Sequence, residues 1–380
     1  LAGRMHAIGS DQLHGDAERP IGDHSSNWPG SGDTPKKMTS NLERAGAGQS
    51  SYEVHDDDVT AEAVHFLNRL GVGKRAGLAE DPFSLTVGLM LPHDPYLARR
   101  QGYDWYRQRI GPPTVRDRFD NDLHPFIRWW RERNGWQAVS DECVLGARAA
   151  YWALVSAMDS MIGQILQALT DNGLAENTLV VYSSDQGFFL GDHGWFDKRW
   201  MYEESFRTPL LVRWPGVTSS AAVDSHLVQN LDFAQTFLDI AGVDAPTEMQ
   251  GRSLVPLLRG GDSGDWRTSV YYHYYEYPAV HSVRRHYGVR TERYKLIYYY
   301  NLGEWELFDV ETDPDELANL YDDSTHGDVL AELKAELVRL RELYTVPEID
   351  PDVEAELNPL QESSGSDLRG PLQALRELRN

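Results

Sequence analysis

The chain is poor in cysteine and has no long apolar run. Cys143 is the only cysteine among the 380 residues, which excludes an intrachain disulfide framework and a zinc site built from several cysteines. No uninterrupted apolar stretch approaches the about 18 residues of a membrane-spanning helix. No signal-peptide pattern stands at the start of the chain. These absences predict a globular chain without a membrane partner.

Basic residues are also scarce. The chain has 36 Lys and Arg against 59 Asp and Glu, and its net charge is −23 at pH 7. Such an acidic chain repels a phosphate backbone, so we expect no nucleic-acid partner. It also repels small anions, so an anionic substrate would need a locally basic pocket. The length suits about two domains, or one large α/β domain with an appendage.

The most informative stretch covers residues 179–215. It opens with an apolar, β-rich run at 179–182 that is typical of a buried strand, and the run stops at Asp185-Gln186-Gly187. In an open parallel sheet, ligands collect beyond the carboxyl ends of strands. A carboxylate and an amide there suit calcium. The same residue types are common in ordinary turns, so composition alone leaves both interpretations open.

The order of motifs in this stretch resembles a known family. Between residues 184 and 216 the chain reads S-D-Q-G, G-D-H-G, D-K, M-Y-E-E-S and R-T-P-L-L-V-R-W-P-G. This order resembles the late core segment of type I sulfatases, which belong to the alkaline-phosphatase-like superfamily. The resemblance implies a sulfuric ester hydrolase that cleaves a sulfate monoester of a small alcohol or sugar. It also implies that Asp185 and Gln186 bind calcium and that Lys198 contacts the sulfate.

The resemblance implies an α/β fold as well. We expect an alkaline-phosphatase-like mixed sheet flanked by helices, with a smaller antiparallel carboxyl-terminal α+β subdomain. Apolar periodicity predicts helices, whereas residues 16–50 predict a loop. Short aromatic-rich stretches predict the antiparallel sheet. The predicted helices are 59–70, 142–169, 228–241 and 328–344; the predicted strands are 83–91, 269–277, 287–290, 294–300 and 304–308. The expected division is a catalytic domain at 1–262, the subdomain at 263–345 and an acidic tail at 346–380.

A second matching segment stands at the amino-terminal edge. G-R-M-H at residues 3–6, followed by a D-Q-x-H-G run, resembles the sulfatase G-K-x-H segment of choline-sulfatase-like enzymes. By that match His6 would lie beside the sulfate ester, and Arg4 stands where the family has lysine. Arginine keeps the charge but replaces a compact ammonium with a planar fork. Taken alone, the stretch also fits a polar loop.

The family's nucleophile has no counterpart in the printed sequence. In sulfatases a paired-aspartate metal motif and a C-x-P/A-x-R motif precede the G-K-x-H segment. The cysteine of the second motif becomes formylglycine, whose hydrate is the nucleophile. Only three residues precede Arg4, and Cys143 lies on a helical pattern that does not match the motif. We therefore expect Cys143 to pack on a helix face, and we expect an inactive piece of a longer, formylglycine-dependent enzyme.

His93 is the third candidate for contact with the sulfate. It lies in P-H-D-P-Y at 92–96, at the end of the predicted strand, where the prolines restrict the backbone. A side chain held in this way is preorganised to hydrogen-bond an oxyanion, although a turn histidine without a role is the alternative. The match to choline-sulfatase-like sequences favours sulfate contact. His6, His93 and Lys198 are all candidates for the acid that protonates the leaving alcohol.

The two halves of the chain resemble enzymes with different substrates. Residues 1–170 are most similar to choline-sulfatase-like enzymes, and residues 179–320 to glycan sulfatases. The expected partner is therefore a small sulfated substrate, either choline sulfate-like or a sulfated sugar. A basic group at 281–286 either meets the non-sulfate part of that substrate or lies on the surface. The alternatives are a phosphodiesterase or phosphonate monoester hydrolase of the same superfamily, and a non-catalytic anion-binding remnant.

Overall fold

The described part of the chain forms two compact units. Unit 1 holds the described residues up to 115, together with 131–179 and 190–196, and unit 2 holds 180–189 and the described residues from 197 on. The computed structural model describes residues 1–4, 18, 20–21, 38–78, 81–115, 131–132, 134–261, 264–277, 281, 283–300 and 302–348. Within that part, no helix is long and apolar enough to cross a membrane.

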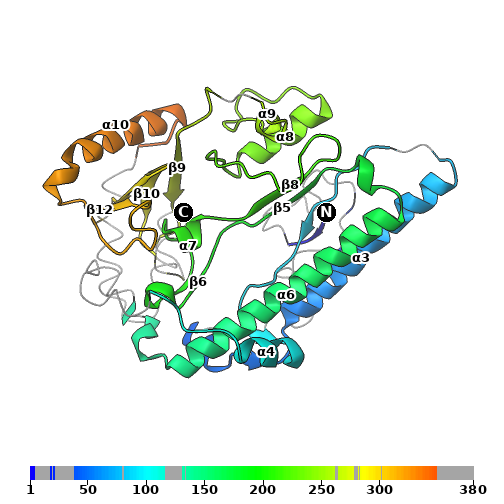
Figure 1. Ribbon diagram of the computed structural model, residues 1–380, viewed down its shortest axis with the longest axis horizontal. Helices are drawn as coiled ribbons and strands as arrows, with labels where there is room; N and C mark the ends of the chain where they lie inside the picture. Colours follow the sequence, from blue (N-terminus) through cyan, green and yellow to red (C-terminus); the bar gives the residue numbers. More distant parts are fainter. Residues whose placement is uncertain are drawn as a thin grey trace, which may run out of the picture. The chain divides into compact units, whose positions relative to one another are not determined.

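Two long helices, α3 (Ser51–Arg75) and α6 (Asp141–Asp171), lie side by side in unit 1 (Figure 1). Each begins after a serine, Ser50 or Ser140, whose hydroxyl accepts a backbone N–H from the first turn. The predicted helices at these places are confirmed. Helix α3 begins earlier than the sequence predicted, because its first turns are polar and lack the apolar repeat. Cys143 lies half-buried in the first turn of α6, on a helix as expected.

The carboxyl ends of α3 and α6 meet at Gly71. A Cβ atom on Gly71 would lie 2.0 Å from Asn172 Oδ1. The Asn172 side chain is held in place, because its Nδ2 donates to Asn68 Oδ1 at 2.8 Å and its Oδ1 accepts from Arg75 Nη1 at 3.1 Å. This approach of the two helices therefore requires a residue without a side chain at position 71.

Two short parallel strand pairs complete the framework of unit 1. Strand β1 (Ala2–Gly3) pairs with β3 (Val87–Gly88), and β2 (Gly46–Ala47) pairs with β4 (Leu97–Ala98). The predicted strand at 83–91 is confirmed only for β3. The reason is Asp56 of α3, whose carboxylate accepts the backbone N–H groups of residues 90 and 91, each at 2.8 Å.

The remaining elements of unit 1 are short. Helix α2 and strand β2 lie inside 16–50, so the predicted loop is wrong there; a six-residue helix is too short to show apolar periodicity. The short helices are α2 (Met38–Glu43), α4 (Arg100–Arg107), and the 3₁₀ turns Trp136–Ala138, Ala175–Asn177 and Asp192–Gly194.

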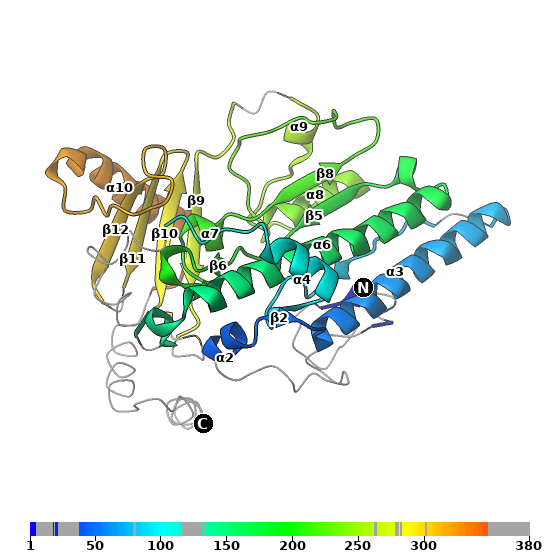
Figure 2. The ribbon, with the colours of Figure 1, turned by 60° about the horizontal axis from the view of Figure 1, so that its bottom comes forward.

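Unit 2 contains a four-stranded antiparallel sheet in the order β12-β11-β10-β9. All four predicted stretches are confirmed as strands, and helix α10 (Gly327–Leu343) packs on the sheet (Figure 2). Leucines of α10 meet apolar strand residues such as Val289, Leu296 and Leu307. The strands are β9 (Ser269–Tyr274), β10 (His286–Thr291), β11 (Tyr294–Tyr299) and β12 (Glu304–Asp309).

The other face of this sheet carries buried charged groups among apolar side chains such as Ile297 and Phe308. Side chains alternate along a strand, so Lys295 points away from the face that carries Leu296. Lys295 is fully buried, and its Nζ lies 2.8 Å from Glu203 Oε1 and 2.5 Å from Glu316 Oε1. Burial alone would raise the pKa of Glu203, but Lys295 and Arg290 hold that pKa below its ordinary value. These ion pairs attach the short helix α7 (Glu203–Phe206) to the sheet.

Two further strands of unit 2 are more exposed to solvent than the buried strands that the sequence predicted. Strand β5 (Val180–Ser183) pairs antiparallel with β8 (Leu210–Arg213), and both are only half-buried, with Leu211 65% exposed. The predicted mixed sheet is represented among the described residues by separate two-stranded pairs. Strands β6 (Phe189–Leu190) and β7 (Phe196–Asp197) each fall on a boundary between the two units, and the other elements of unit 2 are α8 (Asp232–Ala241), α9 (Val255–Leu258) and the 3₁₀ turn Ser324–His326. The predicted helix 228–241 is thus confirmed from Asp232 on.

The helix packing at Gly71 can be tested by adding one methyl group. We expect Gly71→Ala to destabilise the protein by about 1–3 kcal/mol, because the new Cβ overlaps the fixed Asn172 side chain. The matched control is Gly163→Ala in the exposed middle of α6, where nothing lies within 4 Å of the new Cβ. This control should gain about 0.5–1 kcal/mol from helix propensity. Thermal and urea unfolding would measure both, and equal midpoints for the two variants would contradict the packing argument.

His286 of β10 predicts how stability depends on pH. The ring is fully buried and stacks on Trp200 and Tyr274, and burial lowers its pKa to about 4. The unfolded chain has the ordinary value of about 6.5, so it binds the proton first as the pH falls. The neutral His286 ring contributes fully to the free energy of unfolding above about pH 6.5. This contribution is lost as the pH falls toward about 4, and the free energy of unfolding then decreases by about 1.4 kcal/mol per pH unit.

Urea unfolding at several pH values between about 7 and 4 measures this slope. His286→Phe keeps an aromatic ring in the stack and removes the titrating group, so its slope should be smaller by one proton. His273, whose pKa burial lowers to about 3, should retain its own contribution in the variant. An identical slope in both proteins would show that His286 does not titrate in this way.

Candidate active site

The Asp185-Gln186 loop begins where strand β5 ends. Asp185 is exposed, and its Oδ1 accepts the backbone N–H of Gln186 at 2.9 Å. Asp185 Oδ2 and the Gln186 side-chain amide have no partner within the described part of the chain. Two available oxygens suit a hard cation such as calcium. The described residues contain no group of three or more His, Cys, Asp or Glu that could hold a metal.

Gly187 brings this loop against the M-Y-E-E-S segment. Its backbone N–H donates to the carbonyl of Ser205 at 2.8 Å. A Cβ atom on residue 187 would lie 2.0 Å from the carbonyl oxygen of Glu204. Only glycine permits this approach, which explains in structural terms why the S-D-Q-G motif ends in glycine. Two motifs that are separate in the sequence are therefore in contact.

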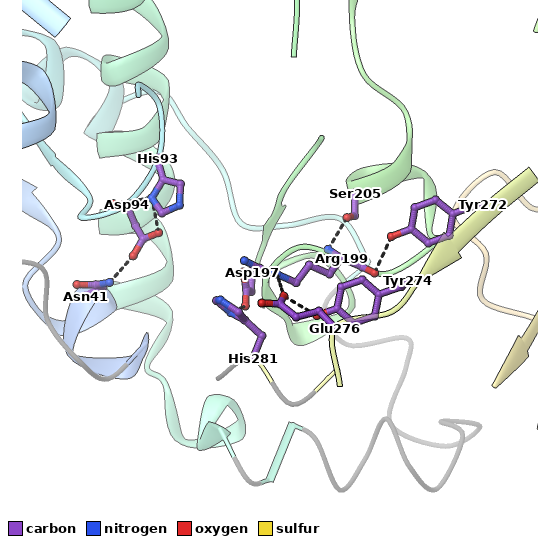
Figure 3. A network of polar contacts seen from close by, with 10 residues as sticks. All are labelled: Asn41, His93, Asp94, Asp197, Arg199, Ser205, Tyr272, Tyr274, Glu276 and His281. Atoms are coloured by element: carbon purple, nitrogen blue, oxygen red, sulfur yellow. Dashed lines mark hydrogen bonds and ion pairs between the residues drawn. The ribbon is translucent and has the colours of Figure 1, made fainter. Parts of the chain in front are cut away.

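Lys198 lies in a strained turn. Its neighbours Asp197 and Arg199 have φ angles of +94° and +85°, in the left-handed region that side chains other than glycine rarely adopt. Such residues cost about 1–3 kcal/mol each and persist only where the surroundings fix them. Here the N–H of Arg199 donates to Ser205 Oγ at 2.8 Å, and its carbonyl accepts from Tyr272 Oη at 3.1 Å (Figure 3).

The structure brings Lys198 next to the Asp185-Gln186 loop. Lys198 is almost fully buried, and its Nζ lies 5.8 Å from the centroid of the Phe188 ring. Phe188 directly follows Gly187. Three of the sequence-predicted site residues, Asp185, Gln186 and Lys198, thus belong to one local arrangement in unit 2.

A polar cluster surrounds the Lys198 turn in Figure 3. Asp197 accepts hydrogen bonds from His281 Nδ1 at 2.7 Å and from Arg199 Nη1 at 2.8 Å. Burial alone would raise the pKa of Asp197, but His281, Arg199 and Lys198 hold that pKa below its ordinary value. Glu276 accepts from Tyr274 Oη at 3.1 Å and lies 3.8 Å from Arg199 Nε. The cluster offers hydrogen-bond donors and acceptors to a polar ligand.

The basic group predicted at 281–286 is split by the structure. His281 joins the polar cluster, whereas His286 is buried among aromatic rings and Arg284 stacks on Tyr277. Sequence reasoning missed Asp197 and Arg199 as members of the site. Their only signal was adjacency to Lys198, because their partners come from distant segments.

Unit 1 holds His93 in one orientation (Figure 3). His93 Nδ1 lies 2.8 Å from the Asp94 carbonyl and 3.0 Å from Asp94 Oδ1. Asn41 Nδ2 donates to Asp94 Oδ2, and the Tyr52 ring stands edge-on to the imidazole at 5.6 Å. Because both atoms that face Nδ1 are acceptors, Nδ1 carries a hydrogen and Nε2 is the nitrogen left for a ligand. Sequence reasoning missed Asp94 and Asn41.

Arg4 lies at the end of β1, beside β3. Its backbone N–H donates to the Gly88 carbonyl at 2.9 Å, and its Nη1 lies 2.9 Å from Met90 Sδ. His6 lies outside the described residues. Unit 1 therefore carries Arg4 and His93, and unit 2 carries the candidate calcium ligands and Lys198.

Two family models match the chain. The model described as "Sulfatase" matches residues 17–243, and the model described as "N-sulphoglucosamine sulphohydrolase, C-terminal" matches residues 191–343. The N-acetylglucosamine-6-O-sulfatase of Bacteroides thetaiotaomicron is 48% identical over 205 residues, which cover 53% of this chain and 36% of that protein. The choline-sulfatase of Rhizobium meliloti is 31% identical over 340 residues, which cover 84% of this chain and 64% of that protein.

The fold is similar to a solved structure of a protein in complex with its substrate D-glucosamine-2-N,6-O-disulfate. The TM-score is 0.66 at 31% sequence identity, and the match covers 76% of this chain and 70% of the other. The chain spans less than two thirds of the length of the two curated relatives. The match to residues 17–243 nevertheless covers more than half of the chain, and so the chain belongs to the sulfatase family.

Proposed function

We propose that the protein hydrolyses the sulfate monoester of a sugar, a hexosamine sulfate, at the site that contains Asp185, Gln186 and Lys198. The observation that carries this proposal is the contact between the Asp185-Gln186 loop and the strained Lys198 turn. It supports a site in which oxygen ligands for a cation and a fixed lysine act on the same group. A sulfate ester needs both, since its oxygens are negatively charged and the leaving oxygen becomes so.

Asp185 and Gln186 would hold a calcium ion through their available side-chain oxygens. The ion would supply Lewis-acid chemistry to the sulfate group when it is bound. No C-x-P/A-x-R segment occurs in the printed sequence, so the nucleophile is not assigned to a residue of this chain.

The resemblance to sulfatases assigns contact with the sulfate oxygens to Lys198 in unit 2 and to Arg4, His6 and His93 in the amino-terminal part of the chain. The turn at Lys198 and the ring of His93 are fixed by their neighbours, so both groups need little reorganisation during the reaction. His93 can hold its Nδ1 hydrogen toward Asp94 and give a proton from Nε2 to the leaving alcohol. His6 and Lys198 are the other candidates for that acid.

A sugar fits the surroundings of Lys198 better than choline. Asp197, Arg199, Glu276 and His281 present donors and acceptors of both charge signs, which suit several hydroxyl groups. A quaternary ammonium has no hydrogen to donate, and proteins recognise it with aromatic cages. Two of the similar proteins are described with N-acetylglucosamine-6-O-sulfatase activity or a glucosamine disulfate substrate, in agreement with this choice.

We also retain as a proposal the division into a catalytic domain at 1–262, a subdomain at 263–345 and an acidic tail at 346–380. In this division the subdomain supports the Lys198 turn.

The substrate proposal can be tested with the protein expressed from its complete coding sequence. N-acetylglucosamine 6-sulfate, choline sulfate and a phosphonate monoester would be compared by kcat/KM. We expect the hexosamine sulfate to be preferred by at least about tenfold, because its hydroxyl groups can hydrogen-bond to the polar cluster and choline sulfate has none to offer. Faster cleavage of choline sulfate would contradict the sugar, and faster cleavage of the phosphonate would favour the alternative hydrolase. Sulfate binding without any turnover would favour the non-catalytic anion-binding protein.

The control for this experiment is a pair of lysine variants. Lys198→Ala should lower kcat/KM by about 10²–10³-fold with little change in the unfolding midpoint, since it removes charge from the developing oxyanion. Lys334→Ala removes the same charge from α10, where Lys334 stacks on Trp305 and Tyr321, and should leave kcat/KM unchanged. Equal activity of the two variants would remove Lys198 from the site.

The calcium assignment predicts a specific loss of metal affinity. Asp185→Asn should weaken calcium binding, measured by isothermal titration calorimetry, by at least about tenfold, because a charged hard ligand is lost. Activity removed by a chelator should return with calcium added to the parent protein and should need more calcium in the variant. Asp322→Asn, at an exposed position of unit 2, is the control and should bind calcium as the parent does. Unchanged affinity in Asp185→Asn would contradict the assignment.

A further inference from the structure

Ser205 contacts both halves of the candidate site in unit 2. Its carbonyl accepts the N–H of Gly187, and its hydroxyl accepts the N–H of Arg199, each at 2.8 Å. Gly187 follows the candidate calcium ligands, and Arg199 follows Lys198. The Ser205 residue itself is only 3% exposed. One buried residue therefore joins the loop that carries the oxygen ligands to the turn that carries the lysine.

The hydroxyl of Ser205 acts where the backbone is strained. Arg199 has a left-handed backbone, and so does Asp197 on the other side of Lys198. A left-handed arginine persists only if its surroundings fix it. The two described contacts to its backbone are Ser205 Oγ at the N–H and Tyr272 Oη at the carbonyl. These two hydroxyls hold the backbone on the carboxyl side of Lys198.

Ser205 is itself firmly supported. It belongs to α7, whose first residue is Glu203. The Glu203 carboxylate forms an ion pair with Lys295 Nζ at 2.8 Å, and the Glu203 backbone N–H donates to the Glu316 carboxylate at 2.7 Å. The backbone N–H of Ser205 donates to the Tyr202 carbonyl at 3.0 Å. The hydroxyl is thus presented to Arg199 from a helix that is attached to the sheet.

We propose that Ser205 is a positioning residue that sets the location of Lys198 relative to Asp185 and Gln186. This inference rests on the proposed roles of those three residues. The carbonyl of Ser205 holds the ligand loop and its hydroxyl holds the lysine turn. Removal of the hydroxyl alone should therefore release the turn and leave the ligand loop in place.

The test is Ser205→Ala in the full chain, with two measurements. Amide hydrogen exchange should become at least about tenfold faster at Arg199 and stay unchanged at Gly187, whose acceptor is the retained carbonyl. The kcat/KM for the hexosamine sulfate should fall by about 10–10²-fold, because a displacement of about 1 Å at a reacting group has an effect of that size. The calcium affinity should not change.

Two controls separate positioning from a general loss of stability. Ser269→Ala removes another buried serine hydroxyl of unit 2, which donates to Glu336, and should alter neither measurement. In a Lys198→Ala background, Ser205→Ala should cause little further loss of kcat/KM, because the residue acts through the lysine. Tyr272→Phe removes the other hydroxyl at Arg199 and keeps the aromatic ring, so it tests the same turn if Ser205→Ala does not fold.

The outcomes are distinguishable. The positioning role would be overturned if the amide exchange rate at Arg199 were unchanged in Ser205→Ala. It would also be overturned if Ser205→Ala lowered kcat/KM as much in the Lys198→Ala background as it does in the parent protein. If no form of the protein cleaves a sulfate ester, the proposed function fails, while the exchange at Arg199 and Gly187 still decides whether Ser205 holds the turn.

Discussion

The buried ion pair between Lys295 and the carboxylates of Glu203 and Glu316 is the constraint on which unit 2 depends. A buried ammonium must be compensated, and the loss of one partner of such a pair costs about 3–5 kcal/mol because an uncompensated charge remains. This requirement fixes α7 on β11. Since Ser205 is part of α7, the fixed helix carries the acceptor of the Arg199 N–H and so the Lys198 turn. The carboxyl-terminal sheet is therefore a structural support of the candidate site.

The two faces of that sheet have different tasks. The face toward α10 is apolar and stabilises the fold by burying side chains, whereas polar contacts on the face toward α7 hold that helix in position. On the second face Tyr202 and Tyr299 donate to the two oxygens of Glu306 at 3.0 and 2.8 Å. Burial and the Glu306 charge raise the pKa of both phenols well above the usual value, so the phenols remain donors at neutral pH. These two hydrogen bonds favour one position of Tyr202 on the sheet, and Tyr202 directly precedes α7.

Patterns in consecutive residues of the sequence predicted most of the helices and strands but few of the contacts in the candidate site. Strands β9–β12 and helices α3, α6 and α10 were predictable because alternation or a helical period is written in consecutive residues. The motif order pointed to Asp185, Gln186 and Lys198. The partners of these residues were not predictable, since contacts such as Gly187 to Ser205 depend on tertiary approach. The left-handed backbone of Asp197 and Arg199 has no residue signature either, because glycine is the usual marker of that conformation.

The charge balance around the Lys198 turn agrees with the proposed calcium site. Around the turn, Arg199 lies close to the carboxylates of Asp197 and Glu276, so the two positive charges of Lys198 and Arg199 are matched by two negative charges, and His281 adds a positive charge only when it is protonated. A sulfate ester approaching a chain of net charge −23 needs a local excess of positive charge. Bound cations are often the largest local charge in such sites. Under the proposed function, the side chains around Lys198 would orient the substrate, and a calcium ion at Asp185 and Gln186 would supply the positive charge that Asp197 and Glu276 cancel.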